Sequence, residues 1–499
     1  MTRTTAEAAS PSSEKAPGPT KQLCNWIPSI SLDQVPDEVQ TRAKHILLDG
    51  IATLLVGAHL PWSETAVRTV FSFEPPGSGA CNVFGWGSET KITPLQAALL
   101  NSTFIQGFEL DDWHSEAPLH SNSLLIPSLL AVAQHEASVS SNSGGRHITS
   151  GKDLLLAAIV GYEIGPRVGL ALYGPNILST GWHSGTVFGP PAVAGAVSKL
   201  LGLNPAQIED AMGTACTQAC GLMSAQFGSD AKRMQHGFAA RNGLMGALLA
   251  RGGYSGIKNV FEEPYGGFLE QFSKGNGKTP SFLPDEIVKN LEVDWKTKGV
   301  NMKPYASMAA THPTVDCVRI LQERHSERFK DSNLDEIKSI TLEMGSDAFH
   351  HGGFQATRPT TAVGAQMACM YVAATQLVDR QVLPPQFAKQ SLDRNEIWSL
   401  VDKTRCVQND NLGDGKFAQR MTVEFADGET ATAEVQNARG VDPELSNEEV
   451  VTKWRDLTKD ILDEERRKKI EELVLGLETC EDVDALIELL TPVVPSVLA

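Results

Sequence analysis

The residues best suited to chemistry lie in one short segment, 109–121, with the sequence ELDDWHSEAPLHS. It holds four carboxylates and two histidines between two apolar segments that are typical of buried helices. Three interpretations are open: a divalent metal site, an acid/base site, or a solvated turn that ends a helix. Oxygen and imidazole ligands suit several divalent ions, but the spacing matches no metal motif such as H-E-x-x-H. We therefore expect no metal at this segment.

His120 favours acid/base chemistry over a simple turn. It directly precedes residues 123–138, an apolar segment that is predicted to be a helix. A histidine at the positive end of a helix dipole can hold or release a proton near neutral pH. A solvated turn does not explain why a histidine stands at this position.

A second histidine lies among glycines. In STGWHSGTVFGPPAVAGA (179–196), Gly181, Gly185 and Gly189 surround His183. Glycine lets the backbone approach a ligand, and the helix N-terminus that follows can hold a carboxylate. A tight loop with one hydrogen-bonded histidine explains the same pattern equally well.

A basic segment lies inside an otherwise alanine- and glycine-rich part of the chain. SDAKRMQHGFAARNG (229–243) contains Lys232 and His236, which are four residues apart and share one face of a helix. In an acidic protein such a local patch suits a dicarboxylate or tricarboxylate. The alternative is an exposed basic helix face, but the flanking small residues indicate close packing.

Two further segments could reach a cleft between domains, where ligands commonly bind. NMKPYASMAATHPTVDC (301–317) carries Lys303 and Tyr305, and SDAFHHGGF (346–354) carries His350. No dinucleotide fingerprint, P-loop or G-x-S-x-G motif is present in the sequence. Cofactor-free acid/base chemistry on an anionic substrate therefore fits these residues best.

The elements that must position these residues are mostly helical. Residues 31–135 show apolar side chains at three- and four-residue spacing, whereas 335–345 and 419–436 alternate like strands. We therefore predict a mainly α protein, with a large all-helical domain built from both chain ends and a smaller inserted α+β domain. The expected boundaries are a disordered tail (1–20), a helical part (21–299), an α+β domain (300–435) and a second helical part (436–499).

The bulk composition excludes several classes of protein. The 499 residues carry a net charge of −17, which argues against a nucleic-acid-binding surface. No apolar run reaches the roughly 18–20 residues of a membrane span, and the N-terminus lacks the apolar region of a secretory signal. The eight cysteines are scattered, without a C-x-x-C pair. We expect a cytoplasmic protein with no membrane or nucleic-acid partner.

The same segments carry a resemblance to a known family. FELDDWHSEAPLHS, GWHSGTVFG, KRMQHGFAARNG and EPYGGFLEQFSKGNG resemble the MmgE/PrpD family, which includes 2-methylcitrate dehydratase, and especially its fungal cis-aconitate decarboxylases. The resemblance covers nearly the whole chain after about residue 20. It implies a helical domain with a smaller α+β lid, a homodimer, a small-molecule di- or tricarboxylate substrate, and a cofactor-free active site between the domains.

The resemblance also assigns site residues. They are, in chain order, Glu109, Asp111, Asp112, His120, His183, Lys232, His236, Lys303, Tyr305 and His350. The lysines would anchor the carboxylates of the substrate, with Glu109 and His236 among the binding residues. Either His120 or His183 would supply the proton, and the two aspartates would orient the histidines. The tyrosine and His350 would complete the catalytic group from the lid.

One departure from the family bears on the substrate. Animal decarboxylases of the family carry a histidine where this chain has Met308, and a methionine cannot transfer a proton. Either another group serves as the acid, or the pocket takes an alkyl-substituted substrate. The predicted function is decarboxylation of cis-aconitate, or of an alkyl-substituted aconitate, to itaconate and CO2. The alternatives are a 2-methylcitrate or alkylcitrate dehydratase, and a helical binding protein that kept the fold.

Overall fold

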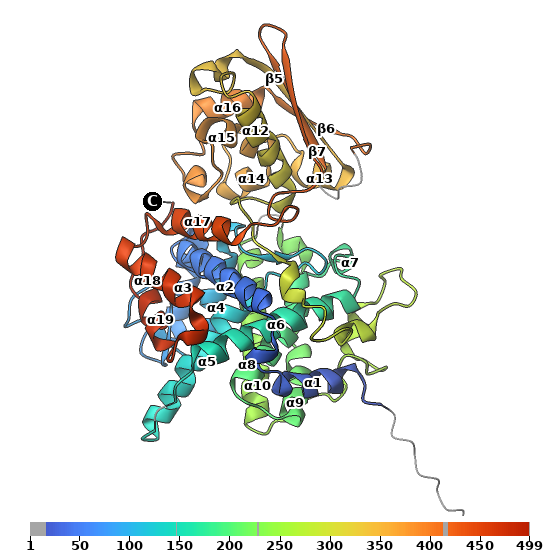
Figure 1. Ribbon diagram of the computed structural model, residues 1–499, viewed down its shortest axis with the longest axis vertical. Coiled ribbons are helices and arrows are strands. Elements are labelled where there is room, and N and C mark those ends of the chain that lie inside the picture. The colour runs from blue at the N-terminus through green and yellow to red at the C-terminus, as the bar shows by residue number, and fades with distance from the viewer. Residues whose placement is uncertain (1–15, 146, 227–228, 413–417, 499) are drawn as a thin grey trace, which may run out of the picture.

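Long apolar helices form the larger part of the computed structural model, which describes residues 16–145, 147–226, 229–412 and 418–498 (Figure 1). Four of them are buried along most of their length because apolar residues surround them instead of forming one stripe: α2 (Asp37–Gly57), α5 (Asn122–Asn142), α6 (Gly151–Ala171) and α8 (Ser184–Leu200). The other helices of this part are α1 (Pro19–Ser29), α3 (Pro61–Phe73), α4 (Pro94–Ile105), α7 (Asn176–Ser179), α9 (Pro205–Cys216), α10 (Ala231–Arg251) and α11 (Phe268–Phe272).

Helix α10 lies at the centre of this helical part. It packs against α4, α8 and α9, while α6 packs against α8 and α4 against α5. Small residues allow the close approach: a Cβ added at Gly243 of α10 would lie 2.6 Å from the carbonyl oxygen of Pro190 in α8. The predicted mainly helical architecture is confirmed. Most of the predicted N-terminal tail, residues 1–15, lies outside the described residues, and α1 begins at Pro19.

One helix of the described chain, α6, is by itself long and apolar enough to cross a membrane, and α2 with α3 passes the same test as a pair bent by 78°. Of the apolar window in α6, 94% is buried inside the protein. Such burial is typical of a core helix.

A four-stranded sheet forms the centre of the smaller part, in the order β6-β5-β7-β8. The strands are β5 (Ile337–Met344), β6 (Thr404–Gln408), β7 (Gln419–Phe425) and β8 (Thr430–Val435). β5 pairs parallel to β6 and antiparallel to β7, which forms a hairpin with β8 through Gly428 at φ 86°. The strands predicted from alternation and the Asp427-Gly428 turn are therefore confirmed. Short two-residue strands elsewhere are β1 (Cys81–Asn82), β2 (Lys91–Ile92), β3 (Trp113–His114) and β4 (Val300–Asn301).

Helices cover the sheet on the side where its buried side chains point. α12 (His312–Arg324) packs against β7 and β8, and α15 (Cys369–Asp379) packs against α12 and α16 (Asn395–Asp402). The side chains of β7 alternate between buried and half-buried, as expected of a sheet with one covered face. The remaining helices of this part are α13 (Ser346–Gly352) and α14 (Ala362–Met367).

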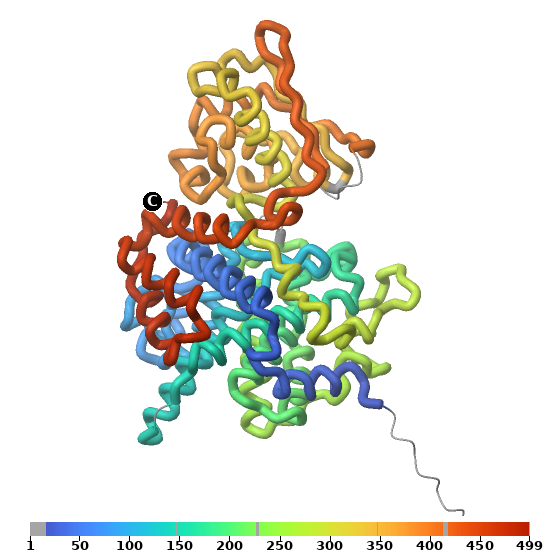
Figure 2. The backbone as a smooth tube through the Cα atoms, in the orientation of Figure 1, coloured from blue at the N-terminus to red at the C-terminus, as the bar shows by residue number. Residues whose placement is uncertain are grey.

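The C-terminal helices return to the helical part, as Figure 2 shows by the red tube beside the blue one. They are α17 (Asn447–Thr458), α18 (Glu464–Leu475) and α19 (Asp484–Leu490). α17 and α18 both pack against α2. The two chain segments that join the parts lie against each other, since a Cβ added at Gly440 would lie 2.7 Å from the carbonyl oxygen of Met302.

Candidate active site

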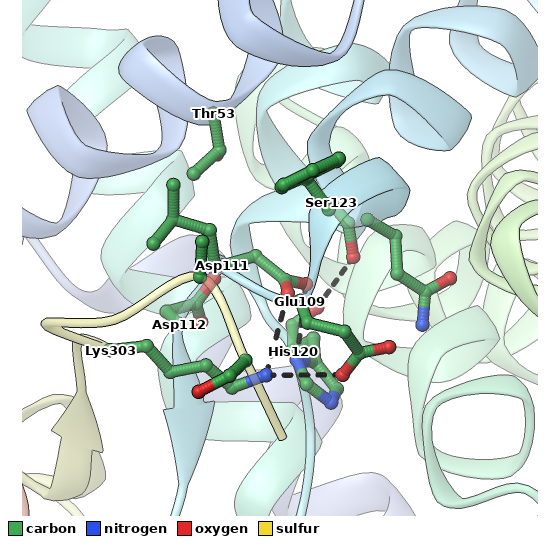
Figure 3. Close-up of polar contacts among 12 residues, drawn as sticks. Thr53, Glu109, Asp111, Asp112, His120, Ser123 and Lys303 are labelled. Carbon is green, nitrogen blue, oxygen red and sulfur yellow. Dashed lines mark hydrogen bonds and ion pairs between the residues drawn. The ribbon is translucent and has the colours of Figure 1, made fainter. Parts of the chain in front are cut away.

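The acidic turn, residues 109–112, follows α4 after a single 3-10 turn and faces three cations. The side chain of Glu109 contacts Lys232 Nζ and lies 2.5 Å from an Nη of Arg233 through the same oxygen. Its other oxygen lies 3.6 Å from Nζ of Lys303 (Figure 3). Glu109 has φ 56° and ψ 32°, a left-handed conformation that costs energy for a non-glycine residue. The fold therefore holds this carboxylate in place at some cost in backbone strain.

The charge of Glu109 is set by these three neighbours. Burial alone would raise the pKa of the carboxyl, but Lys232, Arg233 and Lys303 lower the pKa well below its ordinary value. Burial lowers the pKa of the Lys232 ammonium, and the neighbouring Arg233 lowers it further, while Glu109 opposes both. The result is a buried group in which one carboxylate faces three positive charges, so an anionic ligand would meet an excess of positive charge.

Asp111 of the acidic turn lies beside His120, which comes just before α5. Nδ1 of His120 lies 3.0 Å from Oδ2 of Asp111, and Nζ of Lys303 lies 3.9 Å from Oδ1 of that aspartate (Figure 3). Burial would raise the pKa of Asp111, but the His120 imidazole and the Lys303 ammonium hold it below its ordinary value. Asp111 therefore stays ionised at neutral pH and places a negative charge beside the imidazole of His120.

Asp112 points the other way, into the start of α5. Its two carboxylate oxygens accept the backbone N–H groups of Ser121 (2.8 Å) and Asn122 (3.0 Å). Burial and the nearby Asp111 raise the pKa of this carboxyl to about 7. Both oxygens are occupied by backbone donors at the N-terminus of α5, so this aspartate fixes the position of the helix that follows His120.

The structure makes a first prediction about Asp112. In Asp112→Ala the N–H groups of Ser121 and Asn122 lose their acceptors while they stay buried, which should destabilise the protein by about 2–3 kcal/mol. Urea unfolding followed by circular dichroism measures this change. Asp153→Ala is the matched control, because this aspartate lies in the exposed first turn of α6. An equal stability of the two variants would contradict the assignment.

Three histidines meet beside the acidic turn. The ring of His236 lies 5.3 Å from that of His120 and 5.1 Å from that of His183. Nδ1 of His236 lies 2.8 Å from Oγ of Ser123. A Cβ added at Gly185 would lie 1.7 Å from Nε2 of His236, so only glycine fits there. The glycine-rich sequence around His183 thus serves close approach to a histidine.

The three histidines differ in exposure and in charge. The side chain of His120 is 22% exposed, whereas His183 and His236 are buried. Burial, and then the nearby His120, lowers the pKa of His183 to about 3, and burial with its two histidine neighbours lowers the pKa of His236 well below its ordinary value. Nδ1 of His183 has no hydrogen-bond partner among the described residues. His183 and His236 are therefore neutral at pH 7.

The elements explain why these side chains converge. Lys232, Arg233 and His236 lie on the first two turns of α10, where residues three and four apart share a face. His183 is the N-cap residue of α8, and Lys303 lies on the segment that joins the two parts of the chain. Helix packing of α10 against α4 and α8 brings these positions to the acidic turn.

Two of the predicted residues lie apart from this group. Oη of Tyr305 donates a hydrogen bond to Asp316 (2.5 Å), and Nδ1 of His350 lies 2.7 Å from the carbonyl oxygen of Ser346 on the exposed side of α13. None of the hydrogen bonds or ion pairs of these two residues in the described chain goes to the acidic turn or to the three histidines. The structure thus brings together eight of the ten predicted residues.

Some residues around the turn were not predicted as site residues. Arg233, next to a predicted lysine, contacts Glu109 directly. Nζ of Lys453 donates to the carbonyl oxygen of Leu110 (3.0 Å) and contacts Asp49 (2.5 Å). Arg233 could have been found from its position beside Lys232. Lys453 could not, because it comes from a charged C-terminal segment that has the pattern of an ordinary surface helix.

Comparisons with known proteins identify relatives of this chain. The MmgE/PrpD N-terminal domain matches residues 21–281 and the MmgE/PrpD C-terminal domain matches residues 305–479. The chain is 46% identical to the cis-aconitate decarboxylase-like protein oryM of Aspergillus oryzae, over 95% of this chain and 97% of that one. It is 45% identical to a cis-aconitate decarboxylase of Aspergillus terreus, over 96% and 97% of the two chains, and 26% identical to a cis-aconitate decarboxylase of Homo sapiens, over 94% of each.

No group of three or more His, Cys, Asp or Glu side chains among the described residues is arranged to hold a metal ion. The two domain matches together span most of the sequence, from within α1 to the end of α18 and the turn that follows it. The chain belongs to the MmgE/PrpD family.

Proposed function

We propose that the protein decarboxylates cis-aconitate to itaconate and CO2 without a cofactor. One observation carries the proposal: Lys232, Arg233 and Lys303 surround a single carboxylate beside the His120–Asp111 pair. Three cations against one carboxylate suit a substrate with several carboxylates. The relatives named cis-aconitate decarboxylase, at 45% identity over nearly the whole chain, support the same substrate.

The reaction needs binding, orientation and one proton. The C–C bond to the carboxylate of the CH2 group breaks and CO2 leaves. The electron pair forms a new double bond to the central carbon, and the former double bond shifts its electrons toward the other end carbon and its carboxylate. A proton then forms a C–H bond at that carbon. Holding the departing carboxylate perpendicular to the alkene plane lowers the barrier.

His120 is the proton donor in this proposal. It lies within ion-pair distance of Asp111, and its Nε2 makes no hydrogen bond among the described residues. His183 is neutral at pH 7 because burial and its neighbours lower its pKa to about 3. In that state His183 binds the substrate by hydrogen bonding instead of delivering a proton from an imidazolium ion.

The sheet-bearing part acts as a lid in this proposal, with the domain boundaries expected from the sequence at about residues 300 and 435. Lys303 comes from the connecting segment, and the amide nitrogen of Gln366 on α14 donates to the carbonyl oxygens of Phe108 (3.0 Å) and Ala306 (2.8 Å). A movement of the lid would therefore move a cation of the site and change contacts at the acidic turn.

The protein is also proposed to be a cytoplasmic homodimer. Several large apolar side chains of the helical part are highly exposed, which suits a protein interface; among them are Leu222, Tyr254 and Tyr265. The free cysteines of the described chain suit a reducing compartment. Light scattering on the purified protein measures the mass, and a monomer at micromolar concentration would contradict the dimer.

Product analysis tests the function. The protein is incubated separately with cis-aconitate, an alkyl-substituted aconitate and 2-methylcitrate, and CO2 and organic acids are identified. We expect CO2 and itaconate from cis-aconitate. Lys232→Ala and His183→Ala should stay folded and lose most turnover, for the lysine about 10–100-fold, because a charge-assisted contact to substrate is lost. Lys330→Ala, which changes an exposed lysine, is the control.

Dehydration of 2-methylcitrate without CO2 release from either aconitate would instead identify a dehydratase. Full activity in Lys232→Ala would remove this lysine from the site. Absence of any product, together with no thermal stabilisation by these acids, would favour a binding protein that kept the fold.

A further inference from the structure

A basic cavity lies between the sheet-bearing part and α17. Its volume is about 320 Å³, at the lower end of the range for small-molecule sites. Arg319 of α12, Arg380 at the end of α15, Arg439 after β8 and Lys453 of α17 line it, with two acidic residues. Four basic side chains around one cavity are unexpected in a chain with a net charge of −17.

Two of these cations are already neutralised and two are not. Arg439 pairs with Glu449 at 2.5 Å, and Lys453 pairs with Asp49 at 2.5 Å. Arg380 donates to the carbonyl oxygen of Phe329 (2.8 Å) and has no ion pair among the described residues, and the same residues offer Arg319 no carboxylate within 4.0 Å. Two guanidinium groups therefore remain available for an anion.

The backbone at one of these arginines is strained. Arg380 has φ 57° and ψ 16°, in the left-handed region where a glycine is usual after a helix. A side chain there costs about 1 kcal/mol or more relative to glycine. The strained backbone therefore points to a function of the Arg380 side chain, such as binding an anion, that glycine could not perform.

The cavity also contacts the active site through its walls. Tyr305, which lines the cavity, is two residues from Lys303. Lys453, on another wall, donates to the carbonyl oxygen of Leu110, between Glu109 and Asp111. The walls of the cavity therefore include residues next to Lys303 and to the acidic turn.

We propose that this cavity binds a small polyanion with carboxylate or phosphate groups, held by Arg319 and Arg380. The planar guanidinium group matches both kinds of oxyanion, since it can donate two parallel hydrogen bonds. The site is separate from the proposed catalytic site, because its lining includes none of the three histidines and no residue of the acidic turn.

Calorimetric titration of the full chain tests the proposal, with inorganic phosphate in one arm and citrate in the other. We expect binding of at least one anion, weakened about tenfold or more in Arg319→Gln and in Arg380→Gln. Arg405→Gln, an exposed arginine on β6 outside the cavity, should bind as the unchanged protein does. The arm that shows the loss identifies the kind of anion.

Two results would overturn the proposal. One is no binding of either anion at millimolar concentration. The other is binding with the same affinity in both variants, which would place the anion at the acidic turn instead. If Arg319→Gln fails to fold, Arg380→Gln decides alone, because Arg380 is exposed and its substitution leaves the core unchanged. Neither result depends on turnover, so this test does not decide whether the protein is a decarboxylase.

Discussion

Substitution of His120 by Asn is expected to lower kcat by about 10²–10⁴-fold, the usual contribution of a general acid. The imidazole lies 3.0 Å from Asp111, which stays ionised because His120 and Lys303 lower its pKa. Asparagine keeps a similar size but cannot deliver a proton. The two other histidines cannot replace it readily, because burial keeps His183 and His236 neutral at pH 7.

Steady-state kinetics with cis-aconitate measure the effect, beside a melting curve that shows the variant is folded. His325→Asn, at the exposed C-terminal end of α12, serves as the control and should keep normal turnover. A higher KM alone, with kcat unchanged, would show that His120 only binds substrate. Normal kcat would assign the proton to another group and would restore His183 as the candidate.

The fold was predictable where periodicity is strong. The spacing of apolar residues identified the helices from residue 31 to 135, and alternation identified β5, β7 and β8. The parallel pairing of β5 with β6 was not predictable, because β6 is only five residues long and half exposed. The packing of α17 against α2 was expected only in outline, because its charged sequence does not reveal which helix it contacts.

The candidate site was predictable where chemistry and local spacing coincide. Lys232 and His236 share a helix face, and the acidic turn is contiguous in the sequence. The different orientations of Asp111 and Asp112 were not predictable, because neighbouring carboxylates in one turn look equivalent until the start of α5 is placed. Tyr305 was expected near the lysines, but its hydroxyl is held by Asp316 on α12, a contact between residues eleven positions apart.

Substitution of Glu109 by Gln is expected to destabilise the protein by about 3–5 kcal/mol, since one partner of a buried charged group is removed. Lys232, Arg233 and Lys303 would then face each other without the carboxylate that now contacts all three. Asp111 lies 3.9 Å from Lys303 and can offset only part of this charge. Glu116→Gln, an exposed carboxylate seven residues away in the same segment, is the matched control and should change stability little.

The pH dependence of this difference follows from the lowered pKa of Glu109. A carboxyl whose folded pKa lies below its unfolded value of about 4.5 contributes full stability above that pH. This contribution is lost as the pH falls through the folded pKa, so Glu109→Gln and the unchanged protein should become more alike in acid. The convergence begins only below about pH 4.5. Urea unfolding from pH 7 down to about pH 2 measures it, and a constant difference over that whole range would show that the ion pairs do not stabilise the fold.

An added tricarboxylate should reverse much of the loss at pH 7. If the three cations bind the substrate, a saturated tricarboxylate such as tricarballylate supplies in trans the negative charge that Glu109→Gln lacks. The melting temperature of the variant should then rise more than that of the unchanged protein at equal ligand concentration. An equal rise in both would mean that the anion binds elsewhere, and Glu109 would then stabilise the fold without marking the place where substrate carboxylates bind.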